Sequence, residues 1–313
     1  MTALEAVATY LPDERVPIED LADQLDLTPM QVKVFRRYHK LGEVRLERDG
    51  TVLDLLLAAV DNLHALRGRE HQVRYVVYAR TFPMVVPYPV NPLHELCRLR
   101  GLGHASAFTV THHACASGLL ALDIAGRLLA GDADGDAEED ALALVLAGEK
   151  AFTLESQLVP ETSIFGEGAS ACLVRAGGSR DRMLSYASNI RGEFDGELAD
   201  VAARFQREHA SSLADAITAA VDEAGLRFDE VSLILPHNVN VVAWQRVCRR
   251  IGYPVSRVLL DNVPVTGHVF CADAFFNYQT ARQRDMLHPG DRYVVAAAGS
   301  GRGATFSAMV FEH

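Results

Sequence analysis

The chain has 313 residues, of which 49% are hydrophobic and 23% charged, and its net charge is −11. This length exceeds the usual size of a single domain, so two halves with their own cores are expected. The acidic balance excludes general nucleic-acid binding, which needs a basic surface. The sequence has no apolar run of spanning length and no signal-peptide pattern, so it predicts a cytoplasmic protein that does not enter a membrane.

Strand-like and helix-like segments alternate along the chain, which predicts βαβ units and parallel sheets. A cluster of small residues at 176–179 predicts a division into domains 1–177 and 178–313. In the first half we expect strands at 74–79, 107–110, 141–147 and 169–174, and helices at 52–66 and 118–129. In the second half we expect strands at 183–190, 231–235, 293–298 and 307–311, and helices at 211–224, 241–251 and 272–287.

Cys115 lies where the strand at 107–110 gives way to the helix at 118–129. A thiol near a helix N-terminus is favoured as the nucleophilic thiolate, because the unpaired backbone amides carry a partial positive charge. A free cysteine is more often a small buried hydrophobe. Two histidines downstream, each at the end of a strand or loop, favour the catalytic interpretation here. The five cysteines are odd in number and scattered, so they predict no disulfide framework.

The first of these histidines, His237, follows the strand at 231–235, and ligand sites of open α/β sheets collect at such strand ends. It can act as a general base or donate a hydrogen bond to developing negative charge, although a histidine satisfied within a turn fits the position equally well. The second, His268, follows a glycine and precedes a helix. The glycine-rich loop at 299–303 lacks the lysine of a phosphate loop and favours an oxyanion-binding role.

His112 and His113 lie beside Cys115 and raise the question of a zinc site. Without a second pair of ligands, the metal would lack partners, and in strand geometry the two histidines would face opposite sides. The sequence therefore predicts no metal site.

Five segments together resemble the β-ketoacyl-ACP synthase III branch of the thiolase superfamily. Each is a weak signal alone, but all occur in the family's order and at family-like separations across essentially the whole chain. They are the nucleophile segment 114–118 (Ala-Cys-Ala-Ser-Gly), the strand end 147–150 (Ala-Gly-Glu-Lys), the segment 165–169 (Phe-Gly-Glu-Gly-Ala), the segment 236–240 (Pro-His-Asn-Val-Asn), and the loop 299–303 with the strand that follows it.

The resemblance implies an α/β protein with a thiolase fold, in which two pseudo-symmetric halves form five αβαβα layers, and it implies a homodimer. It also implies that Cys115 attacks an acyl thioester of coenzyme A or of an acyl carrier protein and holds the acyl group. The N–H groups of Cys115 and Gly301 would bind the oxyanion, His237 matches the family's catalytic histidine, and Asn240 matches its supporting asparagine. No cofactor besides the thioester substrate is expected.

In the family, an asparagine within Gly-Asn-Thr-Ser occupies the position of His268. Decarboxylative condensation with a malonyl-type thioester remains the leading expectation, because a neutral imidazole still donates one N–H to an enolate. An imidazole also accepts a proton, so the alternative is acyl transfer to a hydroxyl or amine with His237 or His268 as base. The family's Arg-Thr-Gly-Ile segment is not evident, which favours specialised, secondary metabolism. A non-catalytic partner subunit is disfavoured because Cys115 and His237 are both retained.

The helix expected at 241–251 carries Arg246, Arg249 and Arg250. Spacings of three and four place them on one stripe of an otherwise acidic protein. Acyl carrier proteins are strongly acidic, so the stripe is a candidate docking site for the carrier. A solvated helix face is the competing interpretation.

Overall fold

The computed structural model describes residues 2–87, 89–133, 140–194, 198–301 and 303–313. Within them, a mixed sheet has the strand order β11-β12-β13-β10-β1-β9-β6-β4-β5. Its strands are β1 (Thr2–Tyr10), β4 (Val73–Ala79), β5 (Ser106–Val110), β6 (Leu142–Glu149), β9 (Gly168–Ala176), β10 (Arg182–Arg191), β11 (Val231–Pro236), β12 (Arg292–Gly301) and β13 (Gly303–Glu312).

The sheet consists of two halves with the same pattern of strands. In the first half β5, β4 and β6 are parallel, and β9 runs antiparallel to both β6 and β1. In the second half β11 and β12 are parallel, and β13 runs antiparallel to β12 and β10. The halves meet where β1 pairs with β10 at Ala3 and Arg182. The predicted boundary at 177/178 lies in the connection between β9 and β10.

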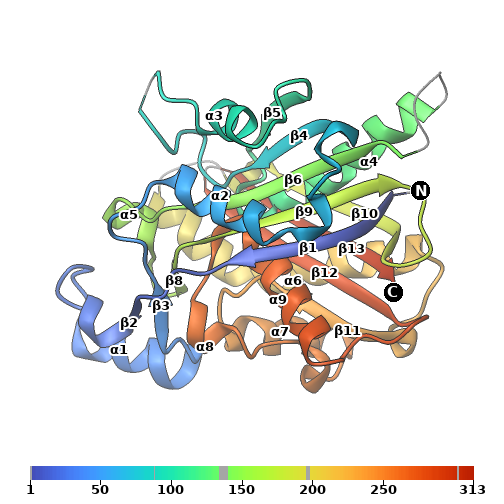
Figure 1. The fold of residues 1–313 in the computed structure, drawn as a ribbon. Helices are drawn as coiled ribbons and strands as arrows, with labels where there is room; N and C mark the ends of the chain where they lie inside the picture. Colours follow the sequence, from blue (N-terminus) through green and yellow to red (C-terminus); the bar gives the residue numbers. More distant parts are fainter. Residues whose placement is uncertain (1, 88, 134–139, 195–197, 302) are drawn as a thin grey trace.

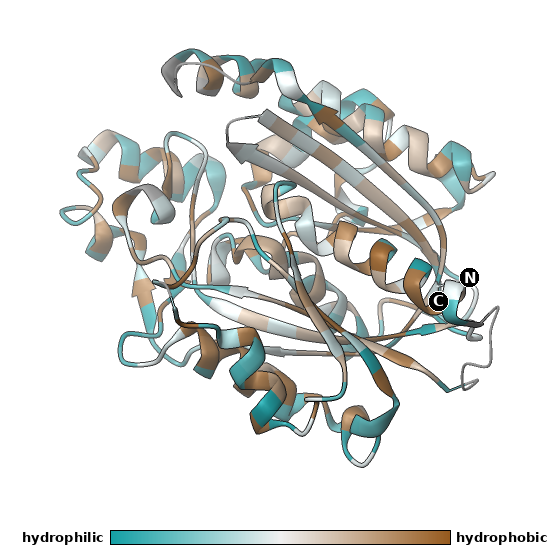
Figure 2. Ribbon diagram, turned by 90° about the horizontal axis from the view of Figure 1, so that it is seen from above, coloured by the Kyte–Doolittle hydropathy of each residue, from teal (hydrophilic) through white to brown (hydrophobic). Residues whose placement is uncertain are grey.

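Helices cover both faces of each half and complete five layers (Figure 1). In the middle layer, α4 (Ser117–Ala133) and α9 (Asp273–Gln283) share one apolar core with strands of both halves, and Figure 2 shows these hydrophobic helices between the two parts of the sheet. Outside the first half lie α2 (Val52–Asn62) and α3 (Pro92–Leu99). Outside the second half lie α6 (Leu198–Glu223) and α7 (Val241–Ile251). The predicted five-layered thiolase fold is confirmed.

Short elements form a smaller unit beside the sheet. A two-stranded sheet of β2 and β3 packs against α8. The backbone N–H of Gly42, just before β3, donates to the carbonyl oxygen of Pro264 in α8 at 3.2 Å. The elements of this region are β2 (Arg15–Pro17), α1 (Pro29–Val34), β3 (Glu43–Arg45), α5 (Leu154–Gln157), β7 (Leu158–Val159), β8 (Ser163–Ile164) and α8 (Val263–Thr266).

The observed elements differ from the sequence-based expectations at a few ends. The helix expected at 211–224 begins at Leu198, because Val201 and Phe205 continue its apolar stripe at a spacing of four and pack on the second-half core. The helix expected at 52–66 ends at Asn62 and is followed by a 3₁₀ turn, His64–Leu66. Strand β1, which the alternation of segments did not predict, lies in the centre of the sheet.

Helix α4 is interrupted by Asp123 and Arg127, so it is not an unbroken apolar run, but it is apolar overall. Residues Ala114–Asp132 form a helical stretch that is long and apolar enough to cross a bilayer by composition, with a mean hydropathy of 1.4. In this fold 61% of the stretch is buried inside the protein. The apolar composition is therefore that of a core helix packed on both sides by sheet.

Candidate active site

Cys115 lies on a short 3₁₀ turn, Ala114–Ala116, between β5 and α4, and is 5% exposed. The backbone on its N-terminal side is strained, because His112 and Ala114 have φ values of 73° and 46°. This left-handed region costs a non-glycine residue about 1–2 kcal/mol, and such strain concentrates at functional sites. The turn thus holds the thiol two residues before the start of α4, where the sequence predicts it.

The glycine-rich end of β12 packs directly against this turn. A Cβ on Gly299 would lie 2.1 Å from the carbonyl oxygen of His113 and 2.9 Å from the Cβ of Ala114. Only glycine allows so close an approach of β12 to the nucleophile segment. Gly301, the predicted oxyanion donor, lies two residues further along β12 and pairs with Gly303 at the turn into β13.

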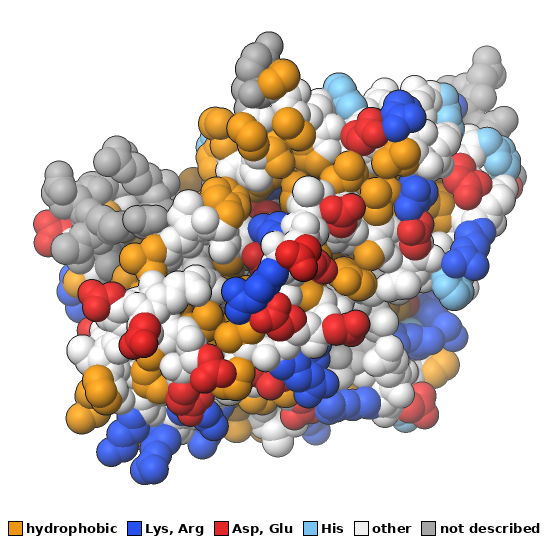
Figure 3. Space-filling model, turned by 60° about the vertical axis from the view of Figure 1, so that its left-hand side comes forward, with side chains coloured by type: hydrophobic (Ala, Val, Ile, Leu, Met, Phe, Trp, Pro, Cys, Tyr) orange, Lys and Arg blue, Asp and Glu red, His pale blue; other side chains and the backbone are white. Residues whose placement is uncertain are grey.

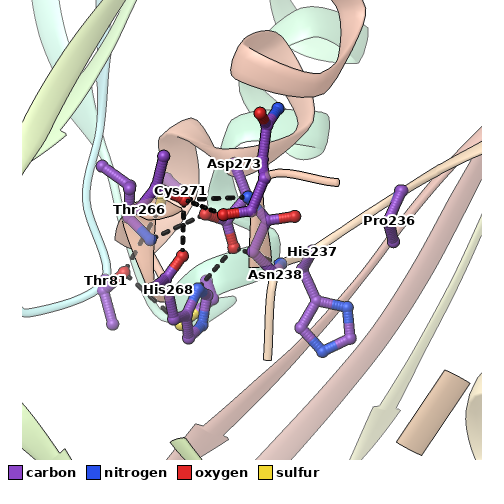
Figure 4. A network of polar contacts seen from close by, with 12 residues as sticks. Thr81, Pro236, His237, Asn238, Thr266, His268, Cys271 and Asp273 are labelled. Carbon is purple, nitrogen blue, oxygen red and sulfur yellow. Dashed lines mark hydrogen bonds and ion pairs between the residues drawn. The ribbon is translucent and has the colours of Figure 1, made fainter. Parts of the chain in front are cut away.

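Three side chains from different segments form a Cys–His–Asp arrangement. Nδ1 of His268 lies 2.5 Å from Oδ2 of Asp273, the first residue of α9, and both side chains are almost fully buried (Figure 4). Cys115 lies close enough to His268 to raise the pKa of the imidazole, and because Nδ1 is engaged by Asp273, Nε2 is the nitrogen left to interact with the sulfur. The backbone N–H groups of Val269 and Asn238 donate to the same carboxylate at 2.7 and 2.6 Å.

The charge of Asp273 controls the protonation of His268. Burial alone lowers the pKa of this imidazole, but the carboxylate, the Cys115 thiolate and the hydrogen bonds to both outweigh burial and raise the pKa to about 10. Phe165 stacks on the ring at a centroid distance of 4.5 Å and, with Phe270, forms an apolar wall around Cys115. Such a wall excludes water and strengthens the electrostatic interactions inside. The imidazole of His268 is therefore held in its protonated form.

His237 follows β11 and is held in a different electrostatic environment. Its ring centroid lies 5.8 Å from that of His268 and 5.7 Å from that of His209. Burial, followed by the neighbouring His209 and His268, places the pKa of His237 well below its ordinary value, so the ring is neutral. Asn277 on α9 donates to Pro236 O at 2.7 Å and fixes the loop that carries this histidine.

A cavity of about 150 Å³ lies beside α7, and Cys115, His237 and His268 are not among the residues that line it. His209 and Asn240 line it near His237, and Arg246 lines it from α7. Nε2 of His209 is buried and has no hydrogen-bond partner in the described structure, and burial followed by the charge of Arg246 lowers the pKa of this histidine to about 4. The cavity is therefore lined by the neutral imidazole of His209 and by the guanidinium of Arg246 on α7.

The remaining predicted site residues lie on or beside α7. Asn240 caps this helix by accepting from the N–H of Ala243 at 2.7 Å, and it donates to Thr162 O at 2.9 Å. Arg246, Arg249 and Arg250 are exposed on α7, and of these Arg246 also lines the cavity. Their docking role stays a prediction.

Sequence reasoning missed Asp273 and two groups beside Cys115. Asp273 had a usable signal, since an acidic residue five positions after His268 begins a helix and can interact with its N-terminus. Thr81, whose hydroxyl lies 3.7 Å from the sulfur of Cys115, and the buried Glu149 had no signal of comparable strength. Both residues lie near Cys115 only because the ends of β4 and β6 are neighbours in the folded sheet.

Comparison with known proteins agrees with this fold. Residues 221–313 match the family model of the 3-oxoacyl-ACP synthase III C-terminal region. The β-ketoacyl-ACP synthase III of Paracoccus denitrificans is 28% identical and covers 93% of this chain and 94% of its own. Among solved structures, the acyltransferase ChlB3 matches with a TM-score of 0.84 at 19% identity, covering 99% of this chain and 97% of its own. The 3-oxoacyl-ACP synthase III of Aquifex aeolicus matches with 0.83 at 18%, covering all of both chains.

The architecture and the solved structures thus show that the chain has the thiolase fold. In sequence it is similar to β-ketoacyl-ACP synthases III, over most of its length to the Paracoccus denitrificans relative and over residues 221–313 to the family model.

Proposed function

We propose that the chain is an acyltransferase that forms a thioester at Cys115 and passes the acyl group to a hydroxyl or amine. The observation that carries this proposal is the buried hydrogen bond between His268 and Asp273, with Cys115 beside the same imidazole. An imidazole oriented by a carboxylate is suited to accept and return protons. The two solved structures named above bear the titles of an acyltransferase and a synthase, so the fold alone does not distinguish the two reactions.

In the first half-reaction, the sulfur of Cys115 bonds to the carbonyl carbon of an acyl thioester after its proton has moved to His268. The bond between that carbon and the donor's sulfur breaks, and the departing thiolate takes the proton from His268. In the second half-reaction, the neutral imidazole takes the proton of the acceptor as oxygen or nitrogen bonds to the acyl carbon. The carbon–sulfur bond to Cys115 then breaks, which restores the starting ion pair.

We assign the oxyanion in both steps to the backbone N–H groups of Cys115 and Gly301, as the family resemblance implies. The close packing of Gly299 on the nucleophile turn supports this assignment, because it brings the end of β12 to the thiol. His237 is neutral and buried, so it can donate a hydrogen bond to substrate but does not hold the resting proton.

Decarboxylative condensation is the second candidate, and one observation favours it. The rings of His237 and His268 lie 5.8 Å apart and both are buried beside the site, so two imidazoles can serve one enolate oxygen. The relative from Paracoccus denitrificans is named as a synthase of this kind. A specialised, secondary-metabolic substrate is proposed for either reaction, since the departures from the family's motifs lie around the site.

The acyl donor we propose is a thioester of coenzyme A or of an acyl carrier protein. The cavity beside His209 supports this proposal, because the exposed Arg246 of α7 lines it and can meet an anionic group there. Anionic carriers would meet the arginine stripe at its mouth.

We also propose a homodimer. Strand β5 is the last strand of the sheet, so its outer edge has unpaired backbone groups that a second copy can extend. Met84, Val90 and Phe152 are 67%, 58% and 56% exposed. Figure 3 shows hydrophobic side chains gathered at the top of the molecule, the end that carries α3 and β5 in Figure 1. Such a patch is typical of an interface.

Intact-protein mass spectrometry tests the proposal directly. The wild type is incubated with acyl thioesters of coenzyme A and of carrier proteins, and then with hydroxyl and amine acceptors. We expect an acyl adduct that disappears when the right acceptor is added, with formation of an ester or amide. Release of carbon dioxide from a malonyl thioester, with a new carbon–carbon bond in the product, would assign condensation instead.

A further inference from the structure

The sulfur of Cys115 has a second polar neighbour besides His268. The hydroxyl of Thr81, just beyond the end of β4, lies 3.7 Å from this sulfur and 3.4 Å from the sulfur of Cys271 (Figure 4). Thr81 is 8% exposed, so water does not replace these contacts freely. The described residues therefore place one hydroxyl between two buried thiols at the centre of the site.

Glu149 fixes the position of that hydroxyl. Its carboxylate accepts the backbone N–H of Thr81 at 2.7 Å and that of Phe82 at 3.0 Å, one on each oxygen. Glu149 ends β6 and is fully buried, and β6 is the parallel neighbour of β4. The carboxyl ends of parallel neighbours meet at one edge of the sheet, so the side chain of one strand end can hold the backbone of the next. No step of the proposed reaction uses this carboxylate.

The protonation states of Cys115 and Cys271 determine which of the two sulfurs accepts the hydrogen bond from the Thr81 hydroxyl. The thiol of Cys271 donates to the carbonyl oxygen of Ala114 at 3.2 Å. Burial, followed by the charges of Glu149 and Cys115, raises the pKa of Cys271, so it stays a thiol. The thiolate of Cys115 is the stronger acceptor, because hydrogen bonds to a charged partner are stronger than those to a neutral one.

We propose that Thr81 is a further catalytic residue, which donates its hydroxyl hydrogen to the Cys115 thiolate, and that Glu149 is the positioning residue for this hydroxyl. The inference rests on the proposed role of Cys115 as nucleophile. The thiolate then accepts hydrogen bonds from both His268 and Thr81, which increases its population at neutral pH.

The same hydroxyl acts again when the acyl group leaves. An acylated sulfur carries no charge and accepts hydrogen bonds weakly, so in the acyl-enzyme the hydroxyl of Thr81 would turn to Cys271, whose sulfur already lies 3.4 Å away. As the carbon–sulfur bond breaks, charge returns to Cys115 and the hydroxyl can follow it. The hydrogen bond thus strengthens as charge develops on the leaving sulfur, which is the condition for catalysis rather than ground-state binding.

The test compares Thr81→Val, which removes the hydroxyl at nearly constant shape, with Thr81→Ser, which retains it. The rate of Cys115 alkylation by iodoacetamide is followed against pH by intact mass, with Cys115→Ala as the background for other thiols. We expect Thr81→Val to raise the apparent pKa of Cys115 by about one unit, and so to slow alkylation about tenfold at low pH. Thr81→Ser should stay within about twofold of the wild type.

Thr111→Val is the matched control, because the hydroxyl of Thr111 lies buried four residues before Cys115 and has no partner in the described structure. It should leave the alkylation profile unchanged. Glu149→Gln should shift the profile in the same direction as Thr81→Val, and the double variant should add little, since the two residues act through one hydrogen bond. Thermal unfolding of each variant checks that the fold is retained.

The outcomes separate this inference from the proposed function. A Thr81→Val enzyme with the wild-type profile would overturn the role of Thr81 while leaving acyl loading of Cys115 intact. A wild type whose Cys115 never accepts an acyl group would overturn the proposed function, although the alkylation profile would still report on Thr81. Equal shifts in Thr81→Val and Thr111→Val would mean a general packing effect and would also reject the role of Thr81.

Discussion

The imidazole of His268 and the carboxylate of Asp273 hydrogen-bond at 2.5 Å in a nearly dry environment, on a turn that leads into α9. The two residues are five positions apart, and Gly267 begins the turn with a φ of 63°. This pair gives the imidazole its charge and its orientation toward Cys115.

Replacing Cys115 by alanine is expected to abolish acyl-enzyme formation and preserve the fold. The change removes only a sulfur atom from a small apolar position, so the melting temperature should stay within about 4 °C of the wild type. Intact mass after incubation with acyl thioesters measures the loading. A stable acyl adduct on the alanine variant would contradict the assignment of the nucleophile.

Asp273→Asn should slow acyl loading by about a hundredfold or more, in the range of general acid–base contributions. The variant lacks the charge that raises the pKa of His268, so this pKa should fall from about 10 toward or below its ordinary value, since burial remains. Single-turnover loading against pH gives both quantities. Asp215→Asn, on the exposed side of α6, is the control and should behave as the wild type. Unchanged loading in Asp273→Asn would reject the triad.

His268→Asn separates the two candidate reactions. If the enzyme transfers acyl groups with His268 as base, this variant should fail to turn over a hydroxyl or amine acceptor, because an amide does not accept a proton at neutral pH. If it condenses, the amide still donates to the enolate, and carbon dioxide release from a malonyl thioester should remain measurable. Radiolabelled malonyl thioester quantifies that release. Wild-type enzyme that releases none with any malonyl donor removes the condensation candidate.

Glu149 should make the stability of the protein depend on pH. Burial raises the pKa of this carboxyl from 4.5 to about 7, although the N–H groups of Thr81 and Phe82 and the nearby Arg80 oppose the shift. Because the folded pKa is the higher one, the stabilising contribution is complete below about pH 4.5 and is lost as pH rises through 7. The loss is at most about 3 kcal/mol, and Glu149→Gln should remove it. Tyr78 and Cys271 also face this carboxyl, but their raised pKa values keep both neutral across this range.

Denaturant unfolding at several pH values between 4.5 and 8 measures this contribution. The difference in unfolding free energy between the wild type and Glu149→Gln should change steadily across the window. As pH rises, the wild type should become less stable relative to the variant. A constant difference would show that Glu149 keeps the same charge throughout the window.

The arginine stripe predicts how the carrier docks. Reversal of Arg249 and Arg250 to glutamate should slow loading from a carrier-bound acyl group and leave loading from a short pantetheine thioester unchanged. The effect should shrink near 1 M salt, where the Debye length is about 3 Å. Arg74→Glu with Arg180→Glu makes the same charge change at exposed positions away from α7 and serves as control. Equal losses with both donors would instead indicate that the arginines support the fold or the cavity.

Much of the fold was predictable because its information is local. Apolar runs and helical periodicity placed α7 at 241–251 and located most strands of the sheet to within a few residues. Strand β1 was missed, since a mixed run of small and polar residues shows no period of two, and its place depends on β9 and β10 on either side. The start of α6 likewise depended on tertiary packing, because Val201 and Phe205 pack on the second-half core.

The sequence by itself predicted the thiolase fold and pointed to Cys115 and the two histidines as candidate site residues, because each stands in a short motif or a periodic segment. Only the tertiary structure decided which groups surround the sulfur. Asp273, Thr81 and Glu149 act on it from the start of α9 and from the ends of β4 and β6, which meet only in the folded sheet. The protonation of His268 and His237 was likewise a tertiary outcome, because it depends on burial and neighbouring charges that local sequence does not encode.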